Sequence, residues 1–283
     1  MFELKLENSN GNTVDINDGV NYVVLSVSGL NPPSASIFTS KSPNRKGAKY
    51  NGSTLNERNI VITIKILGDV EKNRNALYAW IDTEQYAKIY YRNGVKNVYC
   101  EGHVEECEID YFSDNEVIDL AIICENPYWR DLQAISAELT ALLKNFVFPF
   151  AIGAAGVPFS TLSADKFTSV FYDGAETGIQ IHIVFHEETK NFSLFDPNDP
   201  TRIFKFRNTF PQNSILEIDT DSSPKTCKLI KPDGSTENAL KYVAGSPTWF
   251  TLKKGYNYFQ YDSDADGVGI DATISFVNRY LGV

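Results

Sequence analysis

CENPYWRD, residues 124–131, is the stretch that divides this chain of 283 residues into two β-rich blocks. Alternating apolar and polar residues fill the chain before it, and short strand patterns separated by turn residues fill the chain after it. Residues 134–144 have the spacing of an amphipathic helix, and they run into the apolar sequence NFVFPF at 145–150. A linker this apolar is expected to dock on a neighbouring domain. The sequence therefore predicts three parts: a first β-domain over 1–131, a helical joint over 132–160, and a second domain over 161–283.

Composition indicates a folded protein of two domains. The length favours two domains as a soft prior, and 42% hydrophobic with 22% charged residues is ordinary for a globular protein. An aromatic content of 13% favours strands over helices. No run approaches about 18 apolar residues, and the start MFELK lacks the order of a signal peptide. With four cysteines that fit a reducing compartment, the sequence predicts folding in a cytoplasm and no membrane span.

The first block contains the clearest strand and the clearest helix. In residues 58–67 the side chains of Ile60, Ile62, Ile64 and Ile66 share one face of a strand. Asp69 then stands at the N-cap position of an amphipathic helix over 70–82, with Trp80 expected in the core. The first block is therefore predicted to be an antiparallel β-domain with one helix.

Residues 30–56 form a basic island in a chain of net charge −10. They have no sustained apolar period, contain Lys41, Arg45, Lys46 and Lys49, and contain no Asp or Glu. A loop of this length without its own structure is uncommon in a compact domain. It is interpreted either as a mobile solvated loop or as an arm whose cations meet an acidic surface on a neighbouring subunit. The acidic balance elsewhere argues against a protein that binds nucleic acid through phosphates.

The second block reads as a run of short strands separated by clusters of Pro, Asn, Asp and Gly. This spacing predicts a β-sandwich or jelly roll over 161–283. Six aromatic residues of this block could supply a platform for sugars, although alternating aromatics are more often core on one face and ordinary surface on the other. They are Trp249, Phe250, Tyr256, Tyr258, Phe259 and Tyr261.

The search for reactive chemistry predicts no catalytic, cofactor or metal site. The chain has no nucleophile elbow, phosphate-binding loop or HExxH motif. His182 and His186 share a predicted strand about 13 Å apart, which is too far for one metal ion. The cysteine pair at 100 and 107 has no zinc-ligand partner at the usual spacing. The loop DSDADG at 262–267 begins like a calcium loop, but Thr273 stands where that motif needs Glu, so a polar hairpin tip is favoured.

Several short motifs occur in an order that resembles the siphophage tail-component family, the distal tail proteins of phages and prophages of Gram-positive hosts. The quoted stretches are GVNYVVLSVSGL at 19–30, GSTLNERNIVI at 52–62, ILGD at 66–69 before a helix, CENPYW at 124–129, FPF at 148–150 and RYLGV at 279–283. Each motif is short and structural. Their order and spacing over most of the chain carry the resemblance.

The resemblance implies a mainly β protein with a structural task. The expected fold is an N-terminal antiparallel β-domain with one helix and a projecting arm loop, followed by a galectin-like or jelly-roll β-sandwich. Such proteins form hexameric rings at the distal end of the tail, around a channel through which DNA passes without specific binding. The ring joins the tail tube protein to a fibre or lysin protein and, in many phages, to receptor-binding proteins. The implied location is the virion tail tip, after assembly in the cytoplasm of the bacterial host, and no enzyme activity is implied.

Particular residues are expected at two kinds of contact. Lys41, Arg45, Lys46, Lys49 and Arg58 are expected at the subunit interface. Pro127, Tyr128, Trp129 and Phe148 are expected at the domain joint, with Trp129 and Phe148 buried. Two alternatives stay open: an adsorption protein whose second domain binds cell-wall glycan, and the hub of a particle derived from a phage tail.

Overall fold

The computed structural model describes residues 2–43, 46–81, 85–109, 116–140, 142–144, 160–162, 167–264 and 269–283. The chain separates into two compact units: unit 1 is Met1–Leu132 with Arg279–Val283, and unit 2 is Gln133–Asn278. Two differences from the predicted division follow. The second unit begins at 133 rather than after a separate joint, and the last five residues return to the first unit.

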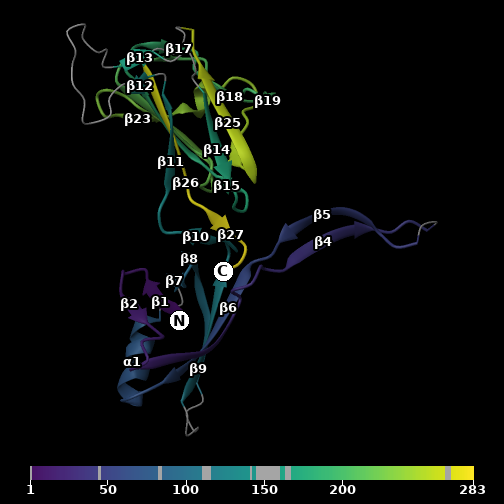
Figure 1. The fold of residues 1–283 in the computed structure, drawn as a ribbon, viewed down its shortest axis with the longest axis vertical. Helices are drawn as coiled ribbons and strands as arrows, with labels where there is room; N and C mark the ends of the chain where they lie inside the picture. Colours follow the sequence, from purple (N-terminus) through teal and green to yellow (C-terminus); the bar gives the residue numbers. More distant parts are fainter. Residues whose placement is uncertain are drawn as a thin grey trace, which may run out of the picture. The chain divides into compact units, whose positions relative to one another are not determined.

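Unit 1 is built on one nine-stranded antiparallel sheet with the order β2-β1-β7-β8-β9-β6-β3, and β10 pairs both β8 and β27 (Figure 1). Strand β6, Arg58–Ile66, alternates buried and less buried residues as its sequence predicts. The buried isoleucines join one apolar core with residues of the neighbouring strands. The other strands are β1 (Glu3–Asn8), β2 (Thr13–Asp15), β3 (Tyr22–Ser28), β7 (Tyr86–Arg92), β8 (Asn97–Ile109), β9 (Val117–Cys124), β10 (Trp129–Asp131) and β27 (Arg279–Tyr280).

The single α-helix of the described residues, α1, runs Val70–Trp80. Its N-cap is Asp69, whose side chain accepts a hydrogen bond from the backbone of Lys72, as the sequence predicts. Leu77 and Trp80 are buried in the core of unit 1. None of the helical segments in the described ranges is long and apolar enough to cross a membrane.

The arm expected over residues 30–56 is present, but it is a two-stranded hairpin rather than a loop without its own structure. Strands β4 (Ala35–Ser40) and β5 (Lys49–Leu55) pair as an antiparallel hairpin that projects from the rest of unit 1 (Figure 1). The hairpin is called the arm below. The sequence hides it because both of its faces are solvent-exposed, so no period-two apolar pattern is required.

Unit 2 is a β-sandwich. The apolar sides of a six-stranded and a four-stranded antiparallel sheet meet in one core of buried aromatic and aliphatic residues. The first sheet has the order β11 (Ile135–Thr140), β26 (Ile270–Phe276), β16 (Gln180–Phe185), β21 (Ser214–Asp219), β22 (Thr226–Ile230) and β23 (Thr236–Asn238). The second has the order β14 (Phe167–Tyr172), β25 (Gly255–Asp262), β18 (Ser193–Asp196) and β19 (Asp199–Lys205).

Three short ladders and one 3₁₀ helix complete unit 2. The ladders are β12 (Leu142–Lys144) with β13 (Ser160–Leu162), β15 (Thr177–Gly178) with β24 (Thr251–Leu252), and β17 (Thr189–Lys190) with β20 (Thr209–Phe210). The 3₁₀ helix η1 is Ala239–Tyr242.

The helix predicted over residues 134–144 is wrong, because this segment contains β11 and β12. Strand β11 pairs with β26 from Ile135↔Phe276 to Thr140↔Asp271, and Leu139 is buried in the sandwich core. Alanine and leucine favour a helix in isolation, but an open sheet edge with a complete ladder overrides that weak preference.

We predict that Gly102→Ala destabilises unit 1. A Cβ at Gly102 would lie 2.3 Å from the carbonyl oxygen of Ile123 and 2.9 Å from Sγ of Cys124. Overpacking of this kind lowers the free energy of unfolding by about 1–3 kcal/mol. Urea unfolding followed by circular dichroism measures the change. Gly94→Ala is the matched control, because nothing lies within 4 Å of a Cβ there. Equal stability of the two variants would contradict the predicted clash.

Candidate assembly interface

The histidines of this chain have separate acidic neighbours. Within the described ranges, no three His, Cys, Asp or Glu side chains are grouped to hold a metal ion. His103 Nδ1 lies 3.8 Å from Glu125, His182 Nδ1 lies 3.6 Å from Glu217, and His186 Nε2 lies 2.8 Å from Asp271. Each ring is thus one half of an exposed or half-buried polar pair.

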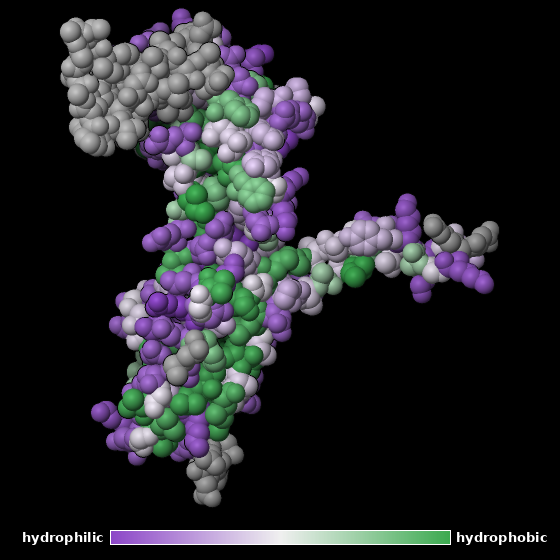
Figure 2. All heavy atoms as spheres, viewed as in Figure 1, coloured by the Kyte–Doolittle hydropathy of each residue, from purple (hydrophilic) through white to green (hydrophobic). Residues whose placement is uncertain are grey.

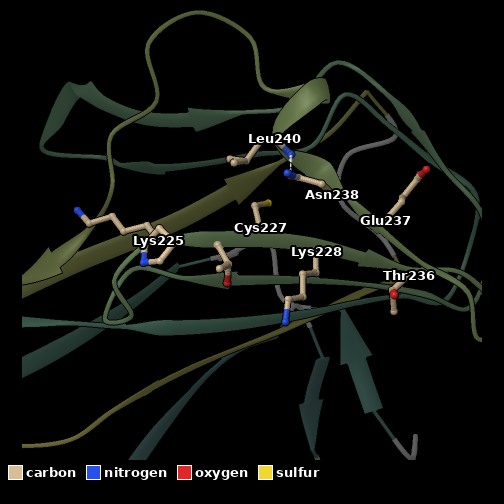
Figure 3. Close-up of a pocket in the computed structure, with 9 residues that line it drawn as sticks. Lys225, Cys227, Lys228, Thr236, Glu237, Asn238 and Leu240 are labelled. Atoms are coloured by element: carbon tan, nitrogen blue, oxygen red, sulfur yellow. Dashed lines mark hydrogen bonds between the residues drawn. The ribbon is translucent and has the colours of Figure 1, made fainter.

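One cavity of about 470 Å³ lies beside β22, β23 and η1 (Figure 3). Cys227 is buried there, and burial raises the pKa of its thiol to about 12, so the nucleophilic thiolate is scarce at neutral pH. Glu237 accepts hydrogen bonds from Lys241 and Tyr242, at 2.8 and 2.9 Å, and these bonds hold its pKa at about 2. The carboxylate therefore stays ionised and is a poor general acid. The lining is Pro224, Lys225, Thr226, Cys227, Lys228, Thr236, Glu237, Asn238 and Leu240.

The arm exposes nearly all of its described side chains, including large apolar ones. Ile37 is 65% exposed, Tyr50 61% and Phe38 55%. In Figure 2 hydrophilic residues gather toward the free end of the arm. A two-stranded hairpin on its own is at best marginally stable in water, and a surface that covered its apolar side chains would stabilise it. Exposed apolar side chains joined to a charged tip have the character of an interaction surface.

The cations of the arm lie at its free end. Lys41 and Lys46 flank the turn and Lys49 begins β5, and all three are exposed. Arg45 lies outside the described residues. A hydrophilic tip with three described lysines suits contact with an acidic surface.

Strand β8 of unit 1 carries such an acidic surface. Glu105, Glu106 and Glu108 are all exposed near the end of this strand. The negative charge of Glu108, with a smaller contribution from Glu105, raises the pKa of the Glu106 carboxyl. Like charges held this close are relieved by an arriving cation, so these three residues, called the acidic edge below, favour a basic partner.

The base of the arm is held by Arg58, which is only 2% exposed. Its guanidinium donates to the carbonyl oxygens of Gly29 and Asn31, which precede the arm, the second at 2.7 Å. It also donates to Pro127 at 2.8 Å and to Leu281 at 2.5 Å. Burial lowers the pKa of Arg58, but a guanidinium stays charged. The structure therefore places Arg58 inside the unit, as the clamp of the arm, rather than on the arm surface.

The residues expected at the joint are partly described. Trp129 is fully buried in the core of unit 1, as expected, and the Arg58 guanidinium lies 5.6 Å from its ring centroid. The guanidinium of Arg279 lies over the ring of Tyr128, with its Cζ atom 5.4 Å from the ring centroid. Phe148 lies outside the described residues. Trp129 thus anchors the point at which the chain leaves unit 1.

The structure separates the six aromatic residues that the sequence grouped as a sugar platform. Phe250, Phe259 and Tyr261 are core residues, and Trp249 packs against the core. Tyr256 and Tyr258 face outward. Phe167 and Phe171, which the sequence reasoning missed, lie beside them on β14. The period-two spacing of 167 and 171 signalled a shared face, but it did not show which face is open.

The loop with the calcium-like sequence is only partly described, since residues 265–268 lie outside the described ranges. Asp264 accepts a hydrogen bond of 2.6 Å from the Asn191 amide. The backbone N–H of Asp264 donates to Lys190. These contacts join the start of the loop to the segment between β17 and β18.

Two family models match the chain. A phage tail protein RIFT-related domain matches residues 9–115, within unit 1. The C-terminal domain of a siphovirus-type tail component matches residues 174–280, almost entirely within unit 2. Between them the two models cover well over half of the chain.

Solved structures of phage tail proteins share this fold. The Dit protein of phage SPP1, described as a paradigm of the hub adsorption apparatus in phages that infect Gram-positive bacteria, superposes with a TM-score of 0.71. Its sequence is 13% identical, over 98% of this chain and 99% of that chain. A chain of the phage P2 baseplate in its activated conformation with Ca reaches 0.53 at 12% identity, over 100% of both chains. No curated protein matches the chain.

We predict that Arg58→Met lowers the free energy of unfolding of unit 1 by about 3 kcal/mol or more. Each buried carbonyl left without its donor costs roughly 1–3 kcal/mol. Arg58→Lys should restore little, because one ammonium cannot replace the planar fork that serves four acceptors. Urea unfolding followed by tryptophan fluorescence measures both variants. The matched control is Arg92→Met, whose side chain is 61% exposed and lies 3.6 Å from Glu3. An Arg58→Met variant as stable as this control would contradict the clamp.

Proposed function

Because this chain belongs to the siphovirus-type tail component family and is a distal tail protein, a structural component of the phage tail-tip hub, we propose that it assembles into a closed ring of six copies. The observation that supports this assembly is the arm. Its exposed apolar and cationic side chains are not buried in the described part of their own chain. In the proposed ring, each arm reaches the next copy.

The proposed contact joins two different surfaces of the same protein. Lys41, Lys46 and Lys49 supply positive charge, and the acidic edge Glu105, Glu106 and Glu108 supplies a negative surface on the neighbouring copy. A contact between two different patches repeats head to tail, and it closes into a ring when the rotation between copies allows it. The apolar side chains Ile37 and Phe38 add buried area, while the charges orient the encounter.

The proposed ring is a connector rather than an enzyme. Its partners would be the tail tube protein on one side, a fibre or lysin protein on the other, and receptor-binding proteins at the periphery. Assembly would take place in the cytoplasm of the bacterial host, before the particle is released. A net charge of −10 suits a conduit for DNA, because an acidic wall does not retain phosphates during passage.

We predict that reversing the arm charges, Lys41→Glu with Lys46→Glu and Lys49→Glu, weakens ring formation by about tenfold or more, which corresponds to about 1.4 kcal/mol. The reversed arm would face the acidic edge with like charge. Mass photometry and negative-stain electron microscopy of the full chain at micromolar concentration and low salt measure the fraction of rings. Raising the salt concentration should also lower the fraction of rings formed by the unaltered protein, because salt screens the attraction between the arm and the acidic edge.

The matched control is Lys225→Glu with Lys228→Glu and Lys253→Glu, which makes the same change in net charge on exposed lysines of unit 2. This control should form rings as the unaltered chain does. Single protomers of the unaltered chain under all these conditions would contradict self-assembly through the arm. Equal loss of rings in both triple variants would show that net charge, rather than the arm, controls assembly.

A further inference from the structure

Four aromatic side chains form a row on the outer face of the four-stranded sheet of unit 2. Phe167 and Phe171 come from β14, and Tyr256 and Tyr258 come from β25. Tyr256 is 65% exposed, Phe171 61% and Phe167 43%, and Tyr258 is half-buried. Val170, next to Phe171, and Phe259, next to Tyr258, point into the core. These four rings are called the aromatic row below.

The pairing of the two strands makes the row continuous. Phe171 is opposite Tyr256, with ring centroids 5.1 Å apart. The ring centroids of Tyr256 and Tyr258 lie 6.3 Å apart, with an angle of 21° between the ring planes. Those of Tyr258 and Phe167 lie 5.7 Å apart, with an angle of 20°. Each of these two neighbouring pairs is therefore tilted by only about 20°, and the four rings follow one another across the two strands.

Such a row calls for a functional explanation. Single exposed apolar side chains are normal on any protein, whereas a contiguous exposed patch marks an interaction site. Sandwich stability does not need these rings outside, because the buried core already contains many aromatic residues. Small polar residues can occupy this exposed face, since Ser169 is exposed between Phe167 and Phe171 on β14. The aromatic residues are therefore not required there by the strand itself.

A polar pocket of about 220 Å³ lies farther along the same sheet. Asp262 lies on the same face of β25 as Tyr258, about 14 Å farther along the strand. Ser193 of β18 is opposite Asp262, and Lys205 of β19 is opposite Ser193. The pocket thus combines carboxylates, cations, an amide and hydroxyls. Its lining is Asn191, Ser193, Lys205, Arg207, Asp262, Ser263 and Asp264.

We propose that the outer face of β14 and β25 binds an extended saccharide chain. Sugar rings present C–H groups with partial positive charge, and these pack on the negative faces of aromatic rings. Sugar hydroxyls both donate and accept hydrogen bonds, which suits a pocket that holds Asn191, Arg207 and Asp262 together. A nucleic acid would also stack on the rings, but the two carboxylates of the pocket offset its two cations, so the pocket offers no net positive charge to hold phosphates. The activity is separate from ring assembly and does not depend on it.

The test uses the full chain and an array of cell-wall polysaccharides purified from Gram-positive bacteria. We expect saturable binding to at least one polysaccharide, measured again in solution by calorimetry. Tyr256→Ala and Phe171→Ala should each weaken that binding about tenfold, whereas Tyr256→Phe, which keeps the ring, should change it little. Thermal unfolding of every variant shows that the sandwich remains folded.

The matched control is Leu240→Ala, since Leu240 is 37% exposed and lines the separate cavity of about 470 Å³ in the same unit. It should bind like the unaltered chain. The proposal is overturned if no polysaccharide binds, or if Leu240→Ala weakens binding while the aromatic variants do not. It is also overturned if the aromatic variants keep full polysaccharide binding but no longer bind a baseplate protein, which would make the row a protein docking surface.

Discussion

The buried guanidinium of Arg58 is the constraint on which the rest of unit 1 depends. A charge removed from water is costly unless it is well hydrogen-bonded, and here the guanidinium donates to the main-chain carbonyl oxygens of Gly29, Asn31, Pro127 and Leu281. Those carbonyls belong to segments far apart in the chain. One side chain therefore fixes the start of the arm, the exit toward unit 2 and the returning C-terminus at the same point.

The Arg58 clamp lies between two parts of unit 1 that differ in how they are stabilised, the buried core and the exposed arm. The core below it is a closed set of buried aliphatic and aromatic residues, and Trp129 joins that core beside the guanidinium. The arm above it has hydrogen-bonded strands but exposed side chains. A rigid base lowers the conformational entropy that an arm loses on docking, so a marginal hairpin can still contribute to association.

The chemistry of the remaining side chains agrees with a structural protein. Burial raises the pKa of the Cys227 thiol, and a hydrogen bond with Cys100, together with burial, raises the pKa of the Cys124 thiol. Both thiols therefore stay protonated as packing groups. Hydrogen bonds from Lys241 and Tyr242 lower the pKa of Glu237 to about 2, which keeps this carboxylate ionised. What distinguishes the surface is shape and charge: an exposed arm, an acidic edge and an aromatic row.

The sequence alone determined the elements whose pattern is local. The alternation at 58–66, the cap at Asp69 with its helix, and the sandwich in the second block all follow from periodicity and turn residues. The order of short motifs also identified the family. Only the tertiary structure decided that residues 135–140 form a sheet edge, that Arg58 is buried, and that Tyr256 is open while Phe259 is core. Periodicity shows which residues share a face, but distant strands decide whether that face is covered.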